Sequence, residues 1–394
     1  MRRRNRWRTT AFTALLLAAS LVALAALGYV CLLARIHGIL SANREVLDLS
    51  NGGDRLDARL IETQGVRMFL LGESHGIAAN EELDFALLRY LHRTAGVRIY
   101  FAEISHAQAC LLNRYLESGD DDLLAFVFGE LRNTPLGTRE HREFIRQFRA
   151  WDATLDPGDR VRIEGVDVEF QPRIAMRFLS DLVQRTGHPV PAALDWLPAR
   201  LRFFRDHPLE TGADFGEELL PSIREHRADY ARWFGDSLVD VEVVAANLRR
   251  EVWADREPTM YAGFLRLYPR YAGKVCYGRW GADHIVQRPV HEREPLATLM
   301  NRPESPVHGR IVSIQPVYEQ SRGIVSDGQF YRTYVASAPA LFRAPFVSPA
   351  GASVTLFRIE AARSLLKLAI PAYPLAEGVQ YVVLIREARP AHPI

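Results

Sequence analysis

The sequence predicts an α/β protein in which helices flank a mainly parallel central sheet, with a helical insertion, after an N-terminal transmembrane helix. Short apolar runs alternate with longer amphipathic segments, a pattern typical of parallel strands joined by helical crossovers. The first run, residues 66–72, is rich in large apolar side chains and suits a central strand buried on both faces. Several runs end near a carboxylate or an imidazole, as expected where a site lies beyond the carboxyl ends of the strands.

The N-terminus predicts a single membrane-spanning helix. Residues 1–8 carry five arginines and no acid, and residues 11–34 contain no charge. A run of this length can cross a bilayer, for which about 20 apolar residues are enough. The arginines predict a cytoplasmic tip, so in a bacterium the chain would cross the inner membrane once, with its main domain periplasmic or extracellular. A cleavable signal ending at Ala23-Leu24-Ala25 is the alternative, but apolar sequence continues to Leu33 and favours an uncleaved anchor.

We divide the chain into a basic tip with the anchor at 1–36, a juxtamembrane linker at 37–65 and an α/β domain at 66–394. The linker is expected to contain a short helical piece near 42–49 and a turn at 51–54, where Asn-Gly-Gly-Asp occurs. A composition of 48% hydrophobic and 24% charged residues is typical of a globular chain that can bury a sizeable core.

The charge balance argues against a nucleic-acid partner. The formal net charge is +2, and leaving out the five arginines of the tip gives −3 for the rest of the chain. Nucleic-acid binding depends on clustered Lys and Arg that neutralise phosphates. We therefore expect a small-molecule substrate, with the membrane contacted through the N-terminal helix.

The three cysteines lie far apart, and their spacing matches no zinc or redox motif. Cys31 lies in the apolar N-terminal run. Cys110 and Cys276 could pair in an oxidising compartment, but both lie in apolar segments, which favours two buried thiols.

The remaining elements alternate between helix and strand. The region of about 172–271 reads as a helical insertion that covers the sheet, clearest at 217–227 and 238–253. A strand and turn are expected over 274–284. The other elements are helices at 79–94, 107–117, 123–131 and 138–152, and strands at 97–105, 160–167, 309–317, 353–358 and 379–385.

Two interpretations are open for the residues that follow the first strand. Glu73 and Ser74 can cap the next helix while His75 hydrogen-bonds locally. Alternatively, Glu73 and His75 form part of a site at the rim of the sheet. The second interpretation gains weight from Glu103, which ends a strand that we expect to neighbour the first, and from His284, which follows a later one.

The order of five short motifs resembles that of the erythromycin esterase-like superfamily, which also contains haem-binding proteins of the ChaN type. The first motif is one residue shorter than the usual esterase form and closer to the ChaN type, and the last motif has one histidine where the esterases usually have two. The motifs are Gly72-Glu73-Ser74-His75-Gly76, Phe101-Ala102-Glu103, Asn113-Arg114-Tyr115, Gly165-Val166-Asp167 and Gly281-Ala282-Asp283-His284.

The resemblance implies a hydrolase that cleaves an ester or a lactone. In the leading hypothesis no cofactor takes part and His75 is the general base on a water molecule, because a histidine held by a carboxylate is a suitable base near neutral pH. Glu73 or Glu103 orients its imidazole, and His284 stabilises or protonates the leaving group. Ser74 is not expected to be a nucleophile because Gly-x-Ser-x-Gly is absent. The residues expected to bind substrate are Ser74, Arg89, Asn113 and Asp167.

Two alternative functions would use the same residues as ligands in place of the general-base mechanism. A haem or iron-binding protein of the ChaN type would bind its ligand at the exported face, since histidine is a common axial ligand of haem. A metallohydrolase would bind a divalent zinc or manganese ion through Glu73, His75, Glu103 and His284.

Overall fold

The structure is a computed structural model that describes residues 2–207, 212–248, 255–290, 292–326, 328–343, 351–369 and 378–394. Its centre is an eight-stranded sheet in the order β1-β9-β10-β6-β2-β5-β3-β4. The strands from β10 to β4 are parallel, β9 is antiparallel to β10, and β1 is antiparallel to β9. The predicted α/β class with a mainly parallel sheet is therefore confirmed. The strands are β1 (Arg44–Val46), β2 (Met68–Glu73), β3 (Val97–Ser105), β4 (Arg162–Asp167), β5 (Val275–Gly281), β6 (Ile311–Glu319), β9 (Val354–Arg358) and β10 (Tyr381–Arg386).

Strand β2 lies in the middle of the sheet and is buried on both faces. Its side chains alternate between two hydrophobic cores, with Phe69 and Leu71 in the first and Met68 and Leu70 in the second. Successive residues of a strand point to opposite faces, so this alternation follows directly from the extended backbone. One expectation is wrong: β2 and β3 are not neighbours, because β5 pairs with both of them and lies between them.

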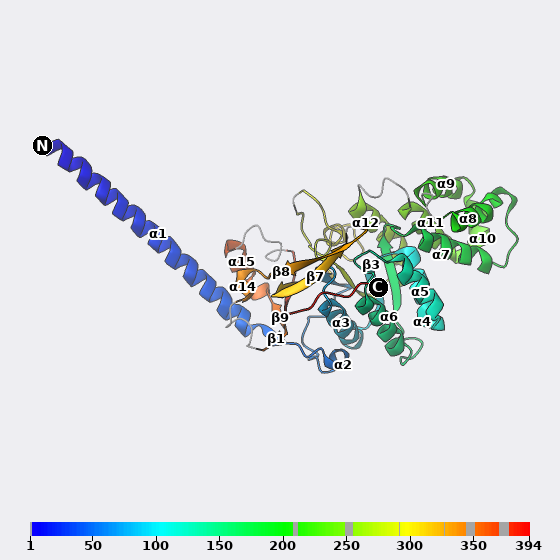
Figure 1. The fold of residues 1–394 in the computed structure, drawn as a ribbon, viewed down its shortest axis with the longest axis horizontal. Coiled ribbons are helices and arrows are strands. Elements are labelled where there is room, and N and C mark those ends of the chain that lie inside the picture. Colours follow the sequence, from blue (N-terminus) through cyan, green and yellow to red (C-terminus); the bar gives the residue numbers. More distant parts are fainter. Residues whose placement is uncertain are drawn as a thin grey trace.

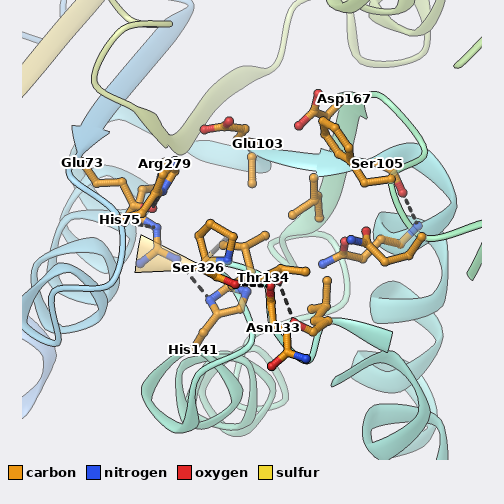
Figure 2. A pocket seen from close by; sticks show the side chains of 18 of the residues that line it. Glu73, His75, Glu103, Ser105, Asn133, Thr134, His141, Asp167, Arg279 and Ser326 are labelled. Atoms are coloured by element: carbon orange, nitrogen blue, oxygen red, sulfur yellow. Dashed lines mark hydrogen bonds and ion pairs between the residues drawn. The ribbon is translucent and has the colours of Figure 1, made fainter. Parts of the chain in front are cut away.

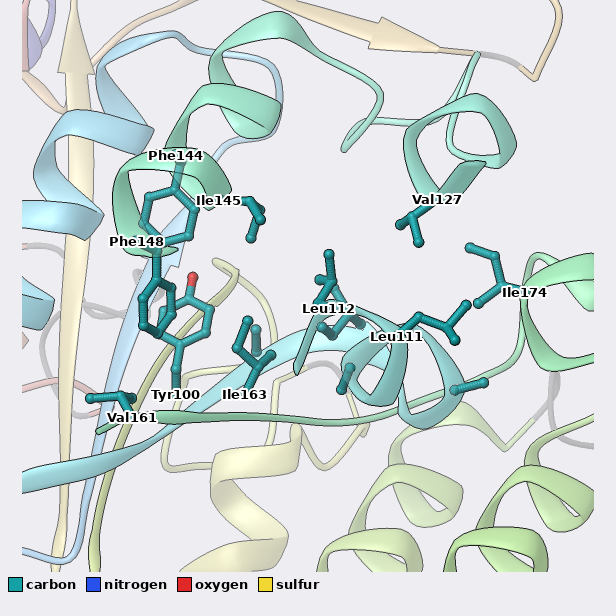
Figure 3. Close-up of a cluster of buried hydrophobic side chains, with 14 of the residues drawn as sticks. Tyr100, Leu111, Leu112, Val127, Phe144, Ile145, Phe148, Val161, Ile163 and Ile174 are labelled. Carbon is teal, nitrogen blue, oxygen red and sulfur yellow. The ribbon is translucent and has the colours of Figure 1, made fainter. Parts of the chain in front are cut away.

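Crossover helices cover the first face of the sheet. Figure 3 shows part of this core, where Phe144 and Phe148 of α6 meet Tyr100 of β3 and where Leu111 and Leu112 of α4 are also buried. Helix α4 begins at an N-cap, Ser105, whose side chain accepts a hydrogen bond from the backbone N–H of Gln108. These helices are α3 (Ala79–Ala95), α4 (His106–Ser118), α5 (Asp121–Glu130) and α6 (Arg139–Asp152).

The predicted insertion is helical, but it packs in two places. Helix α12 covers the second face of the sheet, where Phe264 packs against Phe101 of β3. Of the other long helices, α7 and α11 pack against α4, and α8, α9 and α10 pack on these two or on each other. This group lies at the end of the domain farthest from α1 (Figure 1). The predicted helix at 238–253 is observed as α11, and its expected end at Trp253 lies outside the described residues. The elements are α7 (Pro172–Arg185), η1 (Ala192–Leu194), α8 (Trp196–Asp206), α9 (Gly212–Glu225), α10 (Arg227–Phe234), η2 (Gly235–Ser237), α11 (Leu238–Asn247), α12 (Arg256–Leu267) and η4 (Tyr268–Tyr271).

Helix α1 (Arg2–Ala42) projects from the domain (Figure 1). Its segment Leu15–Ala42 has a mean hydropathy of 2.4 in its most apolar window, none of which is buried, so by length and composition it can span a membrane. The last turns of α1 are buried, unlike the apolar segment before them, because Ile36 and Leu40 lie fully inside the second core. There they lie beside η5 (Glu360–Ala362) and α15 (Arg363–Ala369), so the end of the helix is packed onto the domain.

Two parts of the chain differ from the expected secondary structure. The helical piece expected near 42–49 is wrong, because Arg44–Val46 form β1 and pair with Thr355 to Phe357 of β9. A strand at the sheet edge is held by these ladder hydrogen bonds, which local helix propensity does not reveal. The turn expected at 51–54 is observed in α2 (Ser50–Gly53), where Asn51 and Gly52 have positive φ.

The second difference is a β-hairpin that the sequence interpretation omitted. Strands β7 (Ser321–Ser326) and β8 (Tyr331–Ala336) pair antiparallel outside the main sheet. The Asp327-Gly328 pair between them is a common hairpin signal. The remaining short helices are α13 (Leu296–Met300) and α14 (Ala340–Arg343).

Candidate functional site

A cavity of about 480 Å³ lies beyond the carboxyl ends of β2, β3 and β4. Figure 2 shows the acidic and basic side chains gathered at this edge of the sheet, with a loop from α5 to α6 below them. The volume of the cavity is in the usual range for small-molecule sites. The lining residues include Glu73, His75, Glu103, Ser105, Gln108, Leu131, Thr134, Leu136, His141, Asp167, Phe170, Arg256, Arg279 and Ser326.

His75 is held by Glu73 and lines the cavity. Nδ1 of His75 lies 2.7 Å from Oε1 of Glu73. The Glu73 side chain is 6% exposed, whereas that of His75 is 37% exposed. An added Cβ at Gly281 would lie 3.3 Å from Nε2 of His75 and 3.1 Å from Oε2 of Glu103, so the glycine at the end of β5 leaves room for both groups. This arrangement favours the site interpretation of Glu73 and His75 over helix capping.

Arg279 fixes the second oxygen of Glu73. It lies on β5, between the strands of the two glutamates, and its side chain is 4% exposed. Its Nε is 3.1 Å from Oε2 of Glu73, and its Nη1 is 2.6 Å from Oε2 of Glu81 on α3. Asp84 lies 3.6 Å from the same guanidinium. Glu73 is therefore bound on one oxygen by His75 and on the other by a buried arginine.

Glu103 is the centre of a second network. Its Oε1 lies 2.5 Å from Nη2 of Arg256, which also binds both oxygens of Asp167 at 2.6 and 2.8 Å. Its Oε2 accepts the backbone N–H of Gly281. The ends of β3, β4 and β5 are thus joined to α12 by one arginine and two carboxylates.

His284 lies behind Glu103 and does not line the cavity. Its Nε2 is 3.2 Å from Oε1 of Glu103, and its Nδ1 is 2.5 Å from Oε1 of Glu257 on α12. Burial lowers the pKa of His284, but the charges of the two carboxylates and their hydrogen bonds raise it to about 10. His284 is consequently a buried cation that holds Glu103, and this position does not suit protonation of a leaving group in the cavity.

The neighbouring charges also set the proton affinities of His75 and Glu103. Burial lowers the pKa of His75, but the hydrogen bond to Glu73 and the charges of Glu73 and Glu103 outweigh it and raise the pKa above its usual value. Burial raises the pKa of Glu103, yet His284, His75 and Arg256 together hold it well below its usual range. An ionised Glu103 thus faces an imidazole that gains a proton readily.

The β7–β8 hairpin closes one side of the cavity. The hydroxyl of Tyr334 donates to the backbone oxygen of His75 at 2.7 Å, and the N–H of Ile324 donates to the oxygen of Gly76 at 3.1 Å. Gly76 has φ +74°, and an added Cβ there would lie 2.1 Å from the oxygen of Ile324. The glycine after His75 is therefore required for the hairpin to approach the turn that carries the imidazole.

The structure brings only some of the expected substrate-binding residues to the cavity. Asp167 lines it, but Ser74, Arg89 and Asn113 do not. Arg89 is paired with Asp54 at 2.5 Å and lies at a separate surface depression with His92. Asn113 donates to the oxygen of Ile163 at 2.7 Å and accepts its N–H at 2.8 Å, so its amide joins α4 to β4. Ser74 has its N–H bound to the Tyr318 hydroxyl.

The sequence interpretation missed Arg279, His141 and Arg256. Arg279 could have been found, because an arginine inside the apolar strand run 275–281 must be buried and therefore paired with acids. His141 lies in an amphipathic helix and accepts from Arg279 at 3.1 Å. Arg256 follows an unremarkable stretch of the insertion, and no sequence signal marks it.

The arginines also bear on whether this site suits a metal ion. The carboxylates of Glu73 and Glu103 are each bound by a guanidinium group, and Nε2 of His284 faces Glu103. These cations take the positions from which the carboxylates would bind a divalent ion. The donor set Glu73, His75, Glu103 and His284 is thus a poor fit to the metallohydrolase alternative.

No family model and no curated protein matches this sequence. Among solved structures, a succinoglycan biosynthesis protein is 13% identical, with a TM-score of 0.70 over 91% of this chain and 98% of its own. A mutant of the erythromycin esterase EreC in its open conformation is 15% identical, with a TM-score of 0.60 over 88% of this chain and 98% of its own. A haem-binding ChaN of Campylobacter jejuni reaches a TM-score of only 0.33 at 10% identity, over 75% of this chain, and supports no argument here. The chain therefore has the fold of an erythromycin esterase, as the order of its motifs implied.

Proposed function

We propose that the chain is a membrane-anchored hydrolase that cleaves an ester or a lactone, with His75 as the general base and no metal ion in the reaction. The observation that carries this proposal is the position of His75: its Nδ1 is bound by Glu73, while its ring is 37% exposed at a cavity of small-molecule size. A base must reach the proton that it removes, and the Glu73 contact occupies Nδ1, so we assign this role to Nε2 of the exposed ring. The shared fold with an erythromycin esterase agrees with this class of reaction.

In the proposed reaction, Nε2 of His75 takes a proton from water, and the water oxygen attacks the carbonyl carbon of the ester. Glu73 keeps Nδ1 protonated and stabilises the imidazolium, as carboxylates do in other His-dependent hydrolases. When the tetrahedral intermediate collapses, the imidazolium returns its proton to the leaving alcohol. The products are one acid and one alcohol, and His75 is neutral again.

Arg279 and His284 act as positioning residues in this mechanism. Arg279 binds Oε2 of Glu73 at 3.1 Å, so that Oε1 faces His75. His284 and Arg256 keep Glu103 ionised, and its charge favours the imidazolium that forms during the reaction. Because His284 does not line the cavity, we assign it this supporting role in place of direct proton transfer to the leaving group.

The test is a screen of activated esters and lactones with the full chain in detergent, followed by His75→Ala on any substrate that is cleaved. General-base loss typically lowers turnover about 10²- to 10⁴-fold. The matched control is His392→Ala, because Nδ1 of His392 also lies 2.7 Å from a glutamate oxygen, that of Glu140, at an exposed site outside the cavity. Full turnover in His75→Ala with an unchanged melting temperature would refute the assignment.

We further propose that α1 anchors the domain on the exported side of the membrane. The support is the exposed apolar segment Leu15–Ala42 together with five arginines before it. A reporter enzyme that is active only after export, fused after Ile394, should be active. A reporter that requires the cytoplasm should be inactive at the same position, and the reverse pattern would refute this orientation.

A further inference from the structure

A cluster of metal-ligating side chains lies outside the cavity, where α4 meets α11. His106 is the first residue of α4, Cys110 follows one turn later, and Asp240 is in the first turn of α11. Among the residues that the structure describes, these are the side chains whose ligand atoms come together, all within 4.8 Å of one another. The positions i and i+4 of a helix share one face, so the spacing of His106 and Cys110 points both side chains toward the same point.

We propose that His106, Cys110 and Asp240 bind a zinc ion, or a cation of similar ligand preference, that joins α4 to α11. This site is independent of the proposed hydrolase reaction. Thiolate, imidazole and carboxylate are the three ligand types that zinc binds in proteins. The ion would be held by three side chains, with a fourth position on the solvent side, where Asp240 is 13% exposed.

One of two ligand distances already matches a tetrahedral ion at the shared centre, and the other is shorter. Nε2 of His106 lies 2.8 Å from Oδ1 of Asp240 and 3.6 Å from Sγ of Cys110. Bond lengths of about 2.0 to 2.3 Å in a tetrahedral zinc site separate pairs of ligand atoms by roughly 3.3 to 3.8 Å. The sulfur is thus already at a suitable distance from the imidazole, whereas the Asp240 carboxylate, which Arg270 also binds, would have to move away from the imidazole to admit the ion.

A carboxylate lies near the second ring nitrogen of His106, as is usual for histidines that bind a metal. The His106 side chain is fully buried, and its Nδ1 has no hydrogen-bond partner. Oε2 of Glu164 on β4 also has none and lies 3.8 Å from this Nδ1. Histidines that bind a metal through one nitrogen commonly donate the other N–H to a carboxylate, which fixes the ring and increases its basicity. Glu164 is positioned for that role.

The cluster offers two acidic ligands to a divalent ion, and one of them is shared with an arginine. Two positive charges would be balanced by the Cys110 thiolate and Asp240. Glu164 is already paired with Arg162 at 2.8 Å through its other oxygen. Arg270 donates to both oxygens of Asp240, so it competes with the ion for Oδ1. The second contact, 3.3 Å between Nη2 of Arg270 and Oδ2 of Asp240, can remain when the ion binds Oδ1. Burial lowers the pKa of His106, but Cys110, Asp240 and Glu164 raise it well above its usual value.

Cobalt(II) is the probe for the test, because it takes zinc sites and its thiolate complexes absorb visibly. We titrate the full chain in detergent under reducing conditions and expect one equivalent to give a thiolate-to-cobalt charge-transfer band and the d–d bands of a tetrahedral ion. Zinc should displace the cobalt and raise the melting temperature. Cys110→Ser and Asp240→Asn, which keep the size of each side chain, should each abolish the charge-transfer band or weaken cobalt binding at least tenfold.

Three control variants separate this site from other donors. Cys31→Ala and Cys276→Ala remove the other two thiols, and His75→Ala removes the imidazole of the cavity. All three should bind cobalt as the unaltered chain does. The proposal is overturned if no band forms, if the band persists in Cys110→Ser, or if it is lost in His75→Ala. Hydrolase activity is not the readout, so failure of this site and failure of the proposed function can be told apart.

Discussion

Oε1 of Glu73 lies 2.7 Å from Nδ1 of His75, although the glutamate side chain is 6% exposed and the histidine side chain 37%. The pair thus joins a buried carboxylate to an imidazole at the cavity. Arg279 binds the other oxygen of Glu73, so the carboxylate cannot rotate without losing a charged partner. The orientation of His75 therefore depends on Arg279 as well as on Glu73.

Glu73→Gln should shift the pH dependence of hydrolysis to lower pH. The raised pKa of His75 predicts an acid limb of kcat/KM above pH 6.5, because the base must be neutral to accept a proton. The amide removes the charge that raises this pKa, so the midpoint of the limb should move down while the plateau falls. Rate profiles of both proteins between pH 5 and about 9 test this. An unshifted midpoint would show that another group controls the acid limb.

Arg279→Met should destabilise the fold strongly. The guanidinium is 4% exposed and lies within 3.6 Å of Glu73, Glu81 and Asp84. Removing one partner of a buried ion pair costs about 3 to 5 kcal/mol, because it leaves uncompensated buried charge. Denaturant unfolding measures the change in free energy. Arg89→Met is the control, since its pair with a half-exposed Asp54 should contribute at most about 1 kcal/mol.

His284→Asn should destabilise the protein in a pH-dependent way. The folded pKa of about 10 lies above the ordinary value of 6.5, so the stabilisation is complete below about pH 6.5 and is lost as the pH rises through 10. The difference in unfolding free energy between the original chain and the variant should therefore shrink between pH 6.5 and 10. Thermal or denaturant unfolding at several pH values gives this difference. A constant difference would mean that His284 is not a buried cation.

Removing the exposed part of α1 should give a domain that stays monodisperse without detergent. A chain that begins at Ile36 keeps both Ile36 and Leu40, which are fully buried against the domain. A chain that begins at Arg44 loses both side chains and should melt at a lower temperature, since burying one such residue stabilises by about 1.5 to 3 kcal/mol. Size-exclusion chromatography and thermal unfolding of the two chains provide the comparison. Detergent dependence of the Ile36 chain would contradict a single apolar span.

The sequence by itself predicted the parallel strands from β2 onward with their crossover helices, and the burial of β2. It also predicted that Glu73, His75 and Glu103 would lie at one edge of the sheet. These properties follow from local patterns: apolar runs of strand length, amphipathic periodicity, and the rule that parallel strands end on the same side of a sheet.

Only the tertiary structure decided which strands are neighbours and which charges face each other. Strand β5 pairs between β2 and β3 although it begins some 170 residues after the end of β3. It thereby brings Arg279 to Glu73 and the backbone N–H of Gly281 to Glu103. The roles of His284, Arg256 and the His106 cluster likewise depend on contacts between α12, α11 and α4. Such contacts join residues that are distant in sequence. They therefore produce no local or periodic pattern along the chain from which they could be predicted.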